Sequence, residues 1–359
     1  MTKPLLNTPD KQTDSLPGLF LRYRAEIGTA LRQAITPQNS SKEAIAVYDM
    51  LRYYMGWADT EGNPIVATEG KYLRPTLCLF ACQATGGSIE QAMPAAVALE
   101  LIHNFSLIHD DIQDQDETRH HRKTLWAVWG IPKALVAGNV LRVVADFSLE
   151  ELIRRGVDAE TALGVASLLT EAYLEMIEGQ YLDLSFEGQS DLGMQDYLGM
   201  IARKTGALIR CAFTMGALIG SGDKATANAF RSSGEALGFI FQVRDDVLGV
   251  WGDEKTTGKP VGADIRRKKN SFPVVHAMSQ AKGAEKQSLL DIYRQDEVAE
   301  GDVGRVLEIM DRAETRGCAH EMAMEHGQDA SDALESVELE PSARAEIEEL
   351  IQFLVVREH

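Results

Sequence analysis

Residues 107–116 read Leu-Ile-His-Asp-Asp-Ile-Gln-Asp-Gln-Asp and stand at the end of an apolar segment that covers residues 88–109. Asp110 and Asp114 are four residues apart, so on a helix they share one face, and Asp111 flanks them. Like charges at this spacing destabilise a helix by roughly 0.2–0.5 kcal/mol. A hard divalent cation would offset the repulsion, because Mg²⁺ binds one or two carboxylates and fills its remaining positions with water and phosphate oxygens. A solvated acidic end of a helix is the alternative for this stretch alone.

A second acidic motif occurs in residues 241–249, Phe-Gln-Val-Arg-Asp-Asp-Val-Leu-Gly. Gln242 and Asp245 are three residues apart and share a helical face. An apolar helix rarely holds two carboxylates unless they are paired or bind a metal. Two such helices predict metal sites that face each other in the core of a helical bundle. The candidate metal ligands are Asp110, Asp111, Asp114, Asp245 and Asp246.

The rest of the chain shows helical periodicity and few alternating β patterns, which predicts an all-α protein. Apolar residues recur at helical spacing in residues 19–35, 41–56, 75–84, 133–155, 159–186, 193–219, 225–249, 302–328 and 340–355. No Pro-rich or Ser-rich linker divides the chain, so we expect one helical domain over residues 18–359 after a mobile tail, residues 1–17. The charged segment 280–340 is expected to be solvated surface with small helices.

Composition excludes several classes of protein. The chain has 359 residues with 36 Lys and Arg against 54 Asp and Glu, and the net charge of −18 argues against a nucleic-acid binder. A hydrophobic share of 45% excludes wholesale disorder. No apolar run reaches about 18 residues, so no membrane span is expected. Residues 1–17 lack the apolar core of a secretory signal, which predicts a cytoplasmic location.

An acidic protein binds an anion where basic side chains gather locally or a cation bridges. Basic residues lie close in sequence to both acidic motifs: Lys71 and Arg74 in Gly-Lys-Tyr-Leu-Arg-Pro (70–75), Arg119, Arg122, Lys204, Lys259 and the run Arg-Arg-Lys-Lys (266–269). Each one alone is typical of a solvated surface charge. As a set they supply hydrogen-bond donors for phosphate oxygens.

Together these motifs resemble the trans-isoprenyl diphosphate synthases, the polyprenyl synthetase family. The matching segments are residues 70–75, 101–116, 179–184, 204–205, 241–246 and 258–275. The resemblance implies a single-domain bundle of long antiparallel helices around a central cavity, the isoprenoid synthase fold. It also implies a homodimeric prenyltransferase that joins an allylic diphosphate to isopentenyl diphosphate with three Mg²⁺ ions. Mn²⁺ also suits oxygen ligands.

The resemblance assigns roles by position. The catalytic set is Asp110, Asp111, Asp114, Lys204 and Asp245. Arg119, Lys204 and Lys259 match donors to the allylic diphosphate, with Thr205 beside them and Gln242 supporting Asp245. Lys71, Arg74 and His103 match the isopentenyl diphosphate site. Lys269 is expected to bind substrate as well.

Two positions depart from the family pattern. His120 stands where the family has a second arginine that contacts isopentenyl diphosphate, and it is charged only part of the time near neutral pH. Gly249 replaces the third aspartate of the second motif, and Asp253 could compensate. His120 and His121 therefore keep open a class I terpene cyclase, or a prenyltransferase to another acceptor. A non-catalytic partner subunit is disfavoured because the aspartate pairs are intact.

Product length is linked to Phe105 and Ser106, which lie five and four residues before Asp110, about one helical turn below the metal site. In the resembling family an aromatic residue there limits products to C15–C20. We therefore expect a short-chain product, with geranylgeranyl diphosphate favoured over farnesyl diphosphate. Simple packing of Phe105 in the core is the alternative.

Overall fold

The computed structural model describes residues 17–37, 41, 43–65, 70–189, 191–252 and 260–356. The tail expected for residues 1–17 therefore lies, apart from Pro17, outside the described residues, as do Asp253 and Lys259. The fold is all-α, as predicted, and within the described residues strands occur only as one short hairpin and an isolated bridge.

The elements follow one another as α1 (Gly18–Arg22), α2 (Arg24–Ala34), α3 (Ile45–Tyr54), α4 (Leu73–Ala84), α5 (Ile89–Gln113), β1 (Thr118–Arg119), β2 (Arg122–Lys123), α6 (Leu125–Trp129), α7 (Ile131–Arg154), α8 (Ala159–Phe186), α9 (Met194–Ile201), the π-helix η1 (Ala202–Gly206), α10 (Ala207–Ser221), α11 (Lys224–Trp251), α13 (Ala263–Arg266), α14 (Phe272–Gln280), α15 (Gly283–Arg294), α16 (Glu300–Arg312), α17 (Thr315–Asp332) and α18 (Pro341–Val356).

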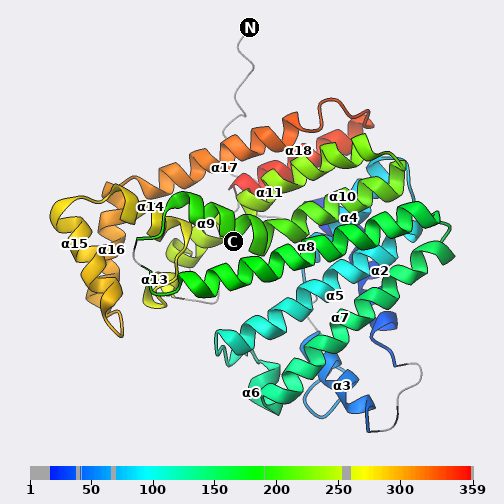
Figure 1. The fold of residues 1–359 in the computed structure, drawn as a ribbon, viewed down its shortest axis with the longest axis horizontal. Helices are drawn as coiled ribbons and strands as arrows, with labels where there is room; N and C mark the ends of the chain where they lie inside the picture. The colour runs from blue at the N-terminus through cyan, green and yellow to red at the C-terminus, as the bar shows by residue number, and fades with distance from the viewer. Residues whose placement is uncertain are drawn as a thin grey trace.

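Long helices form the centre of the molecule (Figure 1). Helix α5 packs between α4 and α7, and α10 packs against α4, α8 and α11. Their starts are fixed by local signals in the sequence. Ser88 and Gln91 form a capping box at the start of α5. Asp158 and Asp223 accept backbone N–H bonds at the starts of α8 and α11, at 3.0 and 2.8 Å.

The main core surrounds α4, α5 and α10, whose apolar residues are buried on several sides. An α-helix that is apolar around most of its circumference must be covered on all of it. Helix α10 is the clearest case, since nearly every residue from Ala207 to Ala217 is buried. This buried layer supports the helices that carry the acidic motifs.

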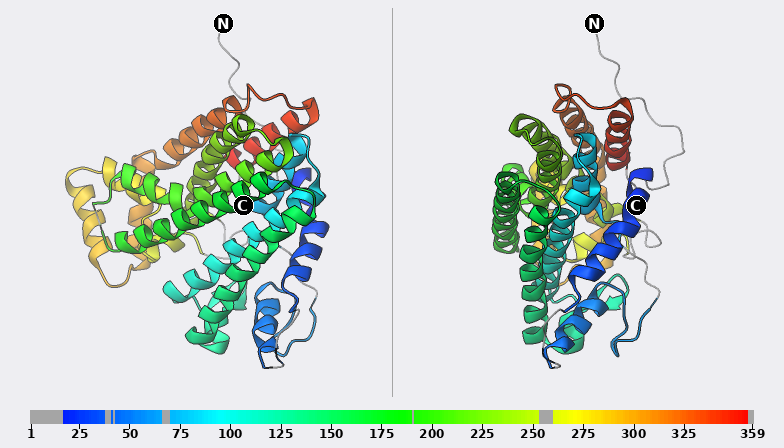
Figure 2. Two further views of the ribbon diagram at one scale, coloured as in Figure 1. Left: turned by 45° about the vertical axis from the view of Figure 1, so that its right-hand side comes forward. Right: turned by 90° about the vertical axis from the view of Figure 1, so that its right-hand side faces the viewer.

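The segment 280–340 differs from the prediction of a solvated surface. Helices α15 and α16 carry their own buried cluster, which includes Leu289, Val303 and Met310. They lie at one end of the bundle, away from α3 and α6 (Figures 1 and 2). Charged and apolar residues occur on opposite faces of these helices. The high number of charged residues in the segment therefore does not indicate that one face of each helix is buried.

Two expected helices are broken. Residues 302–328 divide into α16 and α17 at Glu314, whose backbone φ is +53°. Residues 19–35 divide into α1 and α2 at Tyr23. Periodicity alone does not reveal such breaks, because the apolar pattern continues on either side of them. Within the described residues, no helix is long and apolar enough to span a membrane.

Candidate active site

The first acidic motif occupies the last turns of α5. Asp110 and Asp111 lie within the helix, and Asp114 is its C-cap. Burial raises the pKa of Asp110 to about 6, and the charge of Asp114 adds to the shift while Lys204 opposes it. Burial likewise raises the pKa of Asp114. Asp110 is thus poorly solvated and lies beside the charge of the exposed Asp114, which is a setting that favours binding of a cation.

Asp111 is the most buried member of the motif, at 2% exposure, and its Oδ1 accepts a hydrogen bond from Nε of Arg119 at 2.7 Å. Arg119 lies on β1, which pairs with β2 in an antiparallel hairpin. His120 and His121 form the turn, both with positive φ, as in type I′ turns. Their side chains are exposed at the tip.

The hairpin is anchored on α3. Nη2 of Arg122 donates to the carbonyl oxygen of Ala58 at 2.8 Å, and its guanidinium lies over the ring of Tyr53, 4.2 Å from the centroid. This anchoring fixes the position of Arg119 beside the end of α5.

The second acidic motif lies on α11. Asp246 is buried and accepts hydrogen bonds from the Tyr197 hydroxyl at 2.5 Å, from the backbone N–H of Phe272 at 2.7 Å and from Nε2 of Gln242 at 2.8 Å. Burial nevertheless raises the pKa of Asp246 to about 6. Oε1 of Gln242 in turn accepts a bond from Thr205 at 2.5 Å. Hydrogen bonds within the protein therefore already satisfy the carboxylate of Asp246, while its neighbour Asp245 is exposed.

Lys204 and Thr205 lie in η1, between α8 and α11. A single π-helical turn within an α-helical run is typical of functional sites. The ammonium group of Lys204 pairs with the carboxylate of Asp183 on α8. A Cβ at Gly179 would lie 2.2 Å from the backbone nitrogen of Lys204, and one at Gly238 would lie 2.7 Å from Cα of Gly206. These two glycines permit α8 and α11 to approach η1 closely.

The two acidic motifs share one cation, Lys269. Burial alone would lower the pKa of Lys269, yet four surrounding carboxylates raise it above its usual value. They belong, in order of effect, to Asp264, Asp246, Asp183 and Asp245. Lys269 and Lys204 also lower the pKa of Asp114 against the effect of burial. The two motifs therefore face a common region.

A direct contact also joins the segments that follow the two motifs. Nη2 of Arg267 donates to Oδ1 of Asp116 at 2.8 Å. This ion pair ties the end of the first motif to the segment between α13 and α14.

Gly249 has a steric role. A Cβ at this position would lie 2.1 Å from Oδ2 of Asp264, which comes from α13. The carboxylate of Asp264 thus occupies the space that a side chain at position 249 would fill. A carboxylate is present beside α11 at this point, although it is supplied by a different segment.

The residues assigned to isopentenyl diphosphate lie on and before α4 and on α5. Burial lowers the pKa of Arg74 to about 10, and Glu100 opposes that shift. Burial lowers the pKa of His103 well below its usual value, with Arg74 and Arg119 adding to the effect. His103 is consequently neutral at pH 7. Lys71 is exposed just before α4.

Phe105 is buried at 8% exposure, one turn from the first motif. Its ring lies 4.6 Å from the ring of His109 and 6.2 Å, edge to face, from the ring of Tyr173 on α8. The guanidinium of Arg142 lies over the ring of Tyr173, 4.6 Å from its centroid. Ser106 donates to the carbonyl oxygen of His103 at 2.8 Å.

Sequence reasoning did not single out Asp183, Asp264 or Tyr197. Asp183 had a detectable signal, because Gln180 and Asp183 stand three residues apart at the end of a largely apolar helix. Nε2 of Gln180 donates to Oε1 of Gln113 at 2.9 Å, which joins α8 to the end of α5. Asp264 and Tyr197 reach the site through long-range contacts that no local pattern reports.

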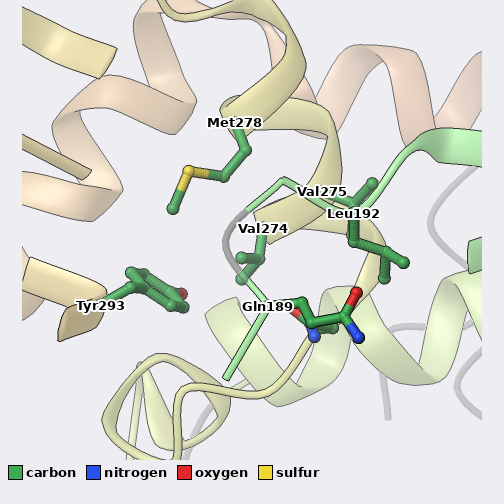
Figure 3. A pocket seen from close by; sticks show the side chains of 7 residues that line it. Gln189, Leu192, Val274, Val275, Met278 and Tyr293 are labelled. Carbon is green, nitrogen blue, oxygen red and sulfur yellow. The ribbon is translucent and has the colours of Figure 1, made fainter. Parts of the chain in front are cut away.

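A separate small cavity lies beside the site, lined by Gln189, Leu192, Asn270, Val274, Val275, Met278 and Tyr293 (Figure 3). Tyr293 extends into it from α15, and its hydroxyl is buried with no hydrogen-bond partner among the described residues. No member of either acidic motif lines this cavity. It is thus distinct from the region between the motifs.

Within the described residues, no three His, Cys, Asp or Glu side chains form a ready-made metal cluster. The donor set still fits Mg²⁺, because that ion needs only one or two protein carboxylates when substrate phosphates complete its shell. The crowding of Asp110 and Asp114 is the structural observation that favours such an ion.

A helical bundle that brings two carboxylate motifs to one lysine, Lys269, is suited to a divalent metal and a substrate that carries phosphate. The chain belongs to the polyprenyl synthetase family, because residues 57–310 match the family model of that description.

Known relatives agree with this assignment. The chain is 40% identical over 261 residues to a geranylgeranyl diphosphate synthase of Mycobacterium tuberculosis, covering 73% of this chain and 72% of the relative. It is 32% identical over 312 residues to a (2E,6E)-farnesyl diphosphate synthase of Mycobacterium bovis, covering 86% of each. The crystal structure of a polyprenyl synthetase from Streptomyces coelicolor superimposes with a TM-score of 0.86 at 34% identity, covering 94% of this chain and 99% of that one.

Proposed function

We propose that this chain is a Mg²⁺-dependent prenyltransferase that joins an allylic diphosphate to isopentenyl diphosphate head to tail, with a C15–C20 product. The observation that carries the proposal is that one lysine, Lys269, has electrostatic neighbours in both acidic motifs, while Lys204 lies beside the first. The family and its named farnesyl and geranylgeranyl diphosphate synthases support the substrate class.

We assign the metal contacts to Asp110 and Asp114 on α5 and to Asp245 on α11, with Mn²⁺ as an acceptable substitute for Mg²⁺. When bound, the metal would neutralise the charge that gathers on the leaving diphosphate. Asp246 is held by three protein donors and positions Gln242 instead. Asp111 holds Arg119 through Oδ1, and its buried Oδ2 accepts no hydrogen bond from a described residue.

The basic residues would bind the two diphosphates. We assign Arg119 and Lys204 as donors to the allylic diphosphate, and Lys269, which has neighbours in both motifs, as a further cation of the site. Lys71, Arg74 and neutral His103 would bind isopentenyl diphosphate. The position of Lys259 lies outside the described residues, so its assigned role rests on the sequence motif alone. Basic side chains that are already in position stabilise a departing diphosphate more strongly in a site that excludes water than they would in water.

The chemistry then needs only bond breaking, bond formation and loss of one proton. The C–O bond of the allylic substrate breaks, and diphosphate leaves with the electron pair. The double bond of isopentenyl diphosphate attacks the resulting cation, and a proton passes to the departed diphosphate. The apolar side chains of α5 around Phe105 would protect the cation from water.

Phe105 and Tyr173 would limit the growing chain. Their edge-to-face contact joins α5 to α8 one turn from the first motif. Aromatic side chains about one helical turn from the metal site would stop the growing prenyl chain at C15–C20. We propose geranylgeranyl diphosphate as the product.

The terpene cyclase alternative is not favoured. It rested on His120 and His121, which lie exposed at the tip of a hairpin. Arg74 and His103 remain buried or partly buried beside the first motif, where a second diphosphate is required. An enzyme that does not bind isopentenyl diphosphate would not need Arg74 and His103 in addition to the residues that bind the allylic diphosphate.

We also propose that residues 18–359 act as one domain and that the chain forms a homodimer through α7 and α8. These neighbouring helices present exposed large apolar side chains, among them Val136, Val143 and Phe147 on α7 and Leu163, Leu174 and Ile177 on α8. Several exposed large apolar side chains on neighbouring helices are typical of a protein interface.

One assay tests the proposed activity. The pure chain is incubated with Mg²⁺, isopentenyl diphosphate and either dimethylallyl, geranyl or farnesyl diphosphate, and products are identified by mass spectrometry. The proposal predicts consumption of isopentenyl diphosphate and formation of a longer diphosphate. A hydrocarbon product, or no consumption of isopentenyl diphosphate, would contradict it.

A further inference from the structure

Helix α3 ends in two consecutive tyrosines with different surroundings. Tyr53 is fully engaged by the protein: its hydroxyl donates to the carbonyl oxygen of Lys123 at 2.8 Å, and its ring meets that of Trp129 edge to face at 5.1 Å. These contacts fix the end of α3 against the hairpin and α6. Tyr54, the next residue, is therefore held in place by its neighbour.

The hydroxyl of Tyr54 is buried and has no hydrogen-bond partner among the described residues. Burial raises the pKa of Tyr54 far above its usual value, and its charged neighbours are Arg119, Asp111, Asp110 and Glu100. A buried hydroxyl without a partner is costly, so native proteins rarely leave one unless a ligand or water completes it. The unpartnered hydroxyl therefore indicates that a polar ligand binds at this position.

Two further buried atoms lack partners within the described part of the chain: Oδ2 of Asp111, which is an electrostatic neighbour of Tyr54, and Nε of Arg74. Arg74 and Tyr54 both have Glu100 as an electrostatic neighbour, and His103 has Arg74 and Arg119. Arg119 and Glu100 are thus the neighbours that Tyr54 shares with His103 and Arg74, two of the residues assigned to isopentenyl diphosphate. A donor among arginines is suited to an anionic oxygen.

His120 explains why another donor is needed there. It stands where the family pattern has its second arginine, and it lies exposed in the turn of the hairpin. A histidine is also a poorer partner for a diphosphate than the arginine of the family pattern.

We propose that the hydroxyl of Tyr54, beside Arg119, donates a hydrogen bond to the diphosphate of isopentenyl diphosphate. It supplies one of the contacts that the substitution of arginine by His120 removes. This inference rests on the proposed function, because it presumes that isopentenyl diphosphate is the second substrate.

The test is Tyr54→Phe, which deletes one oxygen and leaves the ring. Binding of isopentenyl diphosphate alone is measured by isothermal titration calorimetry, and KM for each substrate is measured in the condensation assay. The expected result is a Kd and a KM for isopentenyl diphosphate about tenfold to a hundredfold higher, the range of a hydrogen bond to a charged group. The KM of the allylic substrate should change less than about threefold.

Tyr48→Phe on the same helix is the matched control. It also removes one tyrosine hydroxyl from α3, and the Kd of isopentenyl diphosphate should change less than about threefold. For Tyr54→Phe the melting temperature should not fall, because the lost hydroxyl is unpaired in the free protein. An unchanged Kd for isopentenyl diphosphate, or a loss confined to the allylic substrate, would overturn the inference. Failure of the proposed function would appear separately, as an absence of condensation by the unaltered chain.

Discussion

Oδ2 of Asp264 lies where a Cβ of residue 249 would be, at a separation of 2.1 Å from the ideal Cβ position on Gly249. The glycine that interrupts the second acidic motif is thus the residue that admits a carboxylate from α13. Asp264 is also the strongest of the four carboxylates that act on Lys269. The departure from the family pattern at position 249 therefore leaves the site with a carboxylate nearby.

Gly249→Ala is expected to destabilise the protein by about 1–3 kcal/mol, the usual effect of forcing one extra carbon into a packed region. The Cβ must displace the carboxylate of Asp264 or move α13 away from α11. Condensation activity should fall as well, because Lys269 loses its principal partner. Denaturant unfolding and initial rates measure the two effects.

A double-mutant cycle isolates this contact. Because Asp264→Ala removes the clashing carboxylate, the effect of Gly249→Ala on the free energy of unfolding should shrink by about 0.5–3 kcal/mol in that background. Simple additivity of the two substitutions would show that the contact is not the source of the strain.

Asp110→Asn should lower kcat by at least about a hundredfold, the typical effect of removing one preorganised electrostatic group. Its melting temperature without metal should stay the same or rise, since the substitution removes a poorly solvated charge beside Asp114. Asp49→Asn, which alters an exposed carboxylate paired with Arg52, is the control and should leave kcat unchanged. Turnover of the Asp110→Asn variant within about tenfold of the original enzyme would exclude Asp110 as a metal ligand.

Local sequence signals were sufficient for much of this architecture. Helix α8 covers the same residues, 159–186, that the apolar periodicity predicts, because Asp158 caps it and no proline or glycine pair interrupts it. The acidic motifs were recognisable for a similar reason: carboxylates at helical spacing in apolar helices need a physical explanation.

Other features depend on contacts between distant segments. Nothing local to Asp264 indicates that it reaches Gly249, and nothing local to Tyr54 indicates that its hydroxyl lacks a partner. The π-helical turn at Lys204 also depends on packing, since two glycines on α8 and α11 let the neighbouring helices approach it. Hydrophobic periodicity reports which face of a helix is buried, not what covers it.

Phe105→Ala should lengthen the product beyond C20, because it removes the ring that meets Tyr173 one turn from the metal site. Product chain length is read by mass spectrometry with farnesyl diphosphate as the allylic substrate. Truncation of a buried phenylalanine costs about 3–5 kcal/mol, so the assay belongs well below the melting temperature. Phe105→Tyr should keep the original length, and an unchanged product from Phe105→Ala would assign Phe105 to core packing only.

Phe147→Glu should convert the proposed homodimer to a monomer. The side chain is 61% exposed on α7, and a charge there would have to be buried unpaired at the interface. Sedimentation velocity measures the change, with Tyr48→Phe on α3 as a variant outside the interface. A monomeric unaltered chain, or a dimeric Phe147→Glu variant, would contradict the proposed interface.

The central claim is that carboxylates from α5 and α11 hold one diphosphate through Mg²⁺. Isothermal titration of farnesyl diphosphate into the unaltered chain, Asp110→Asn and Asp245→Asn, each with Mg²⁺ and with a chelator, tests it most directly. The account predicts tight binding only for the unaltered chain with Mg²⁺, and a loss of at least about tenfold in both variants. Equal affinity with chelator, or a variant that binds as well as the unaltered chain, would contradict the account.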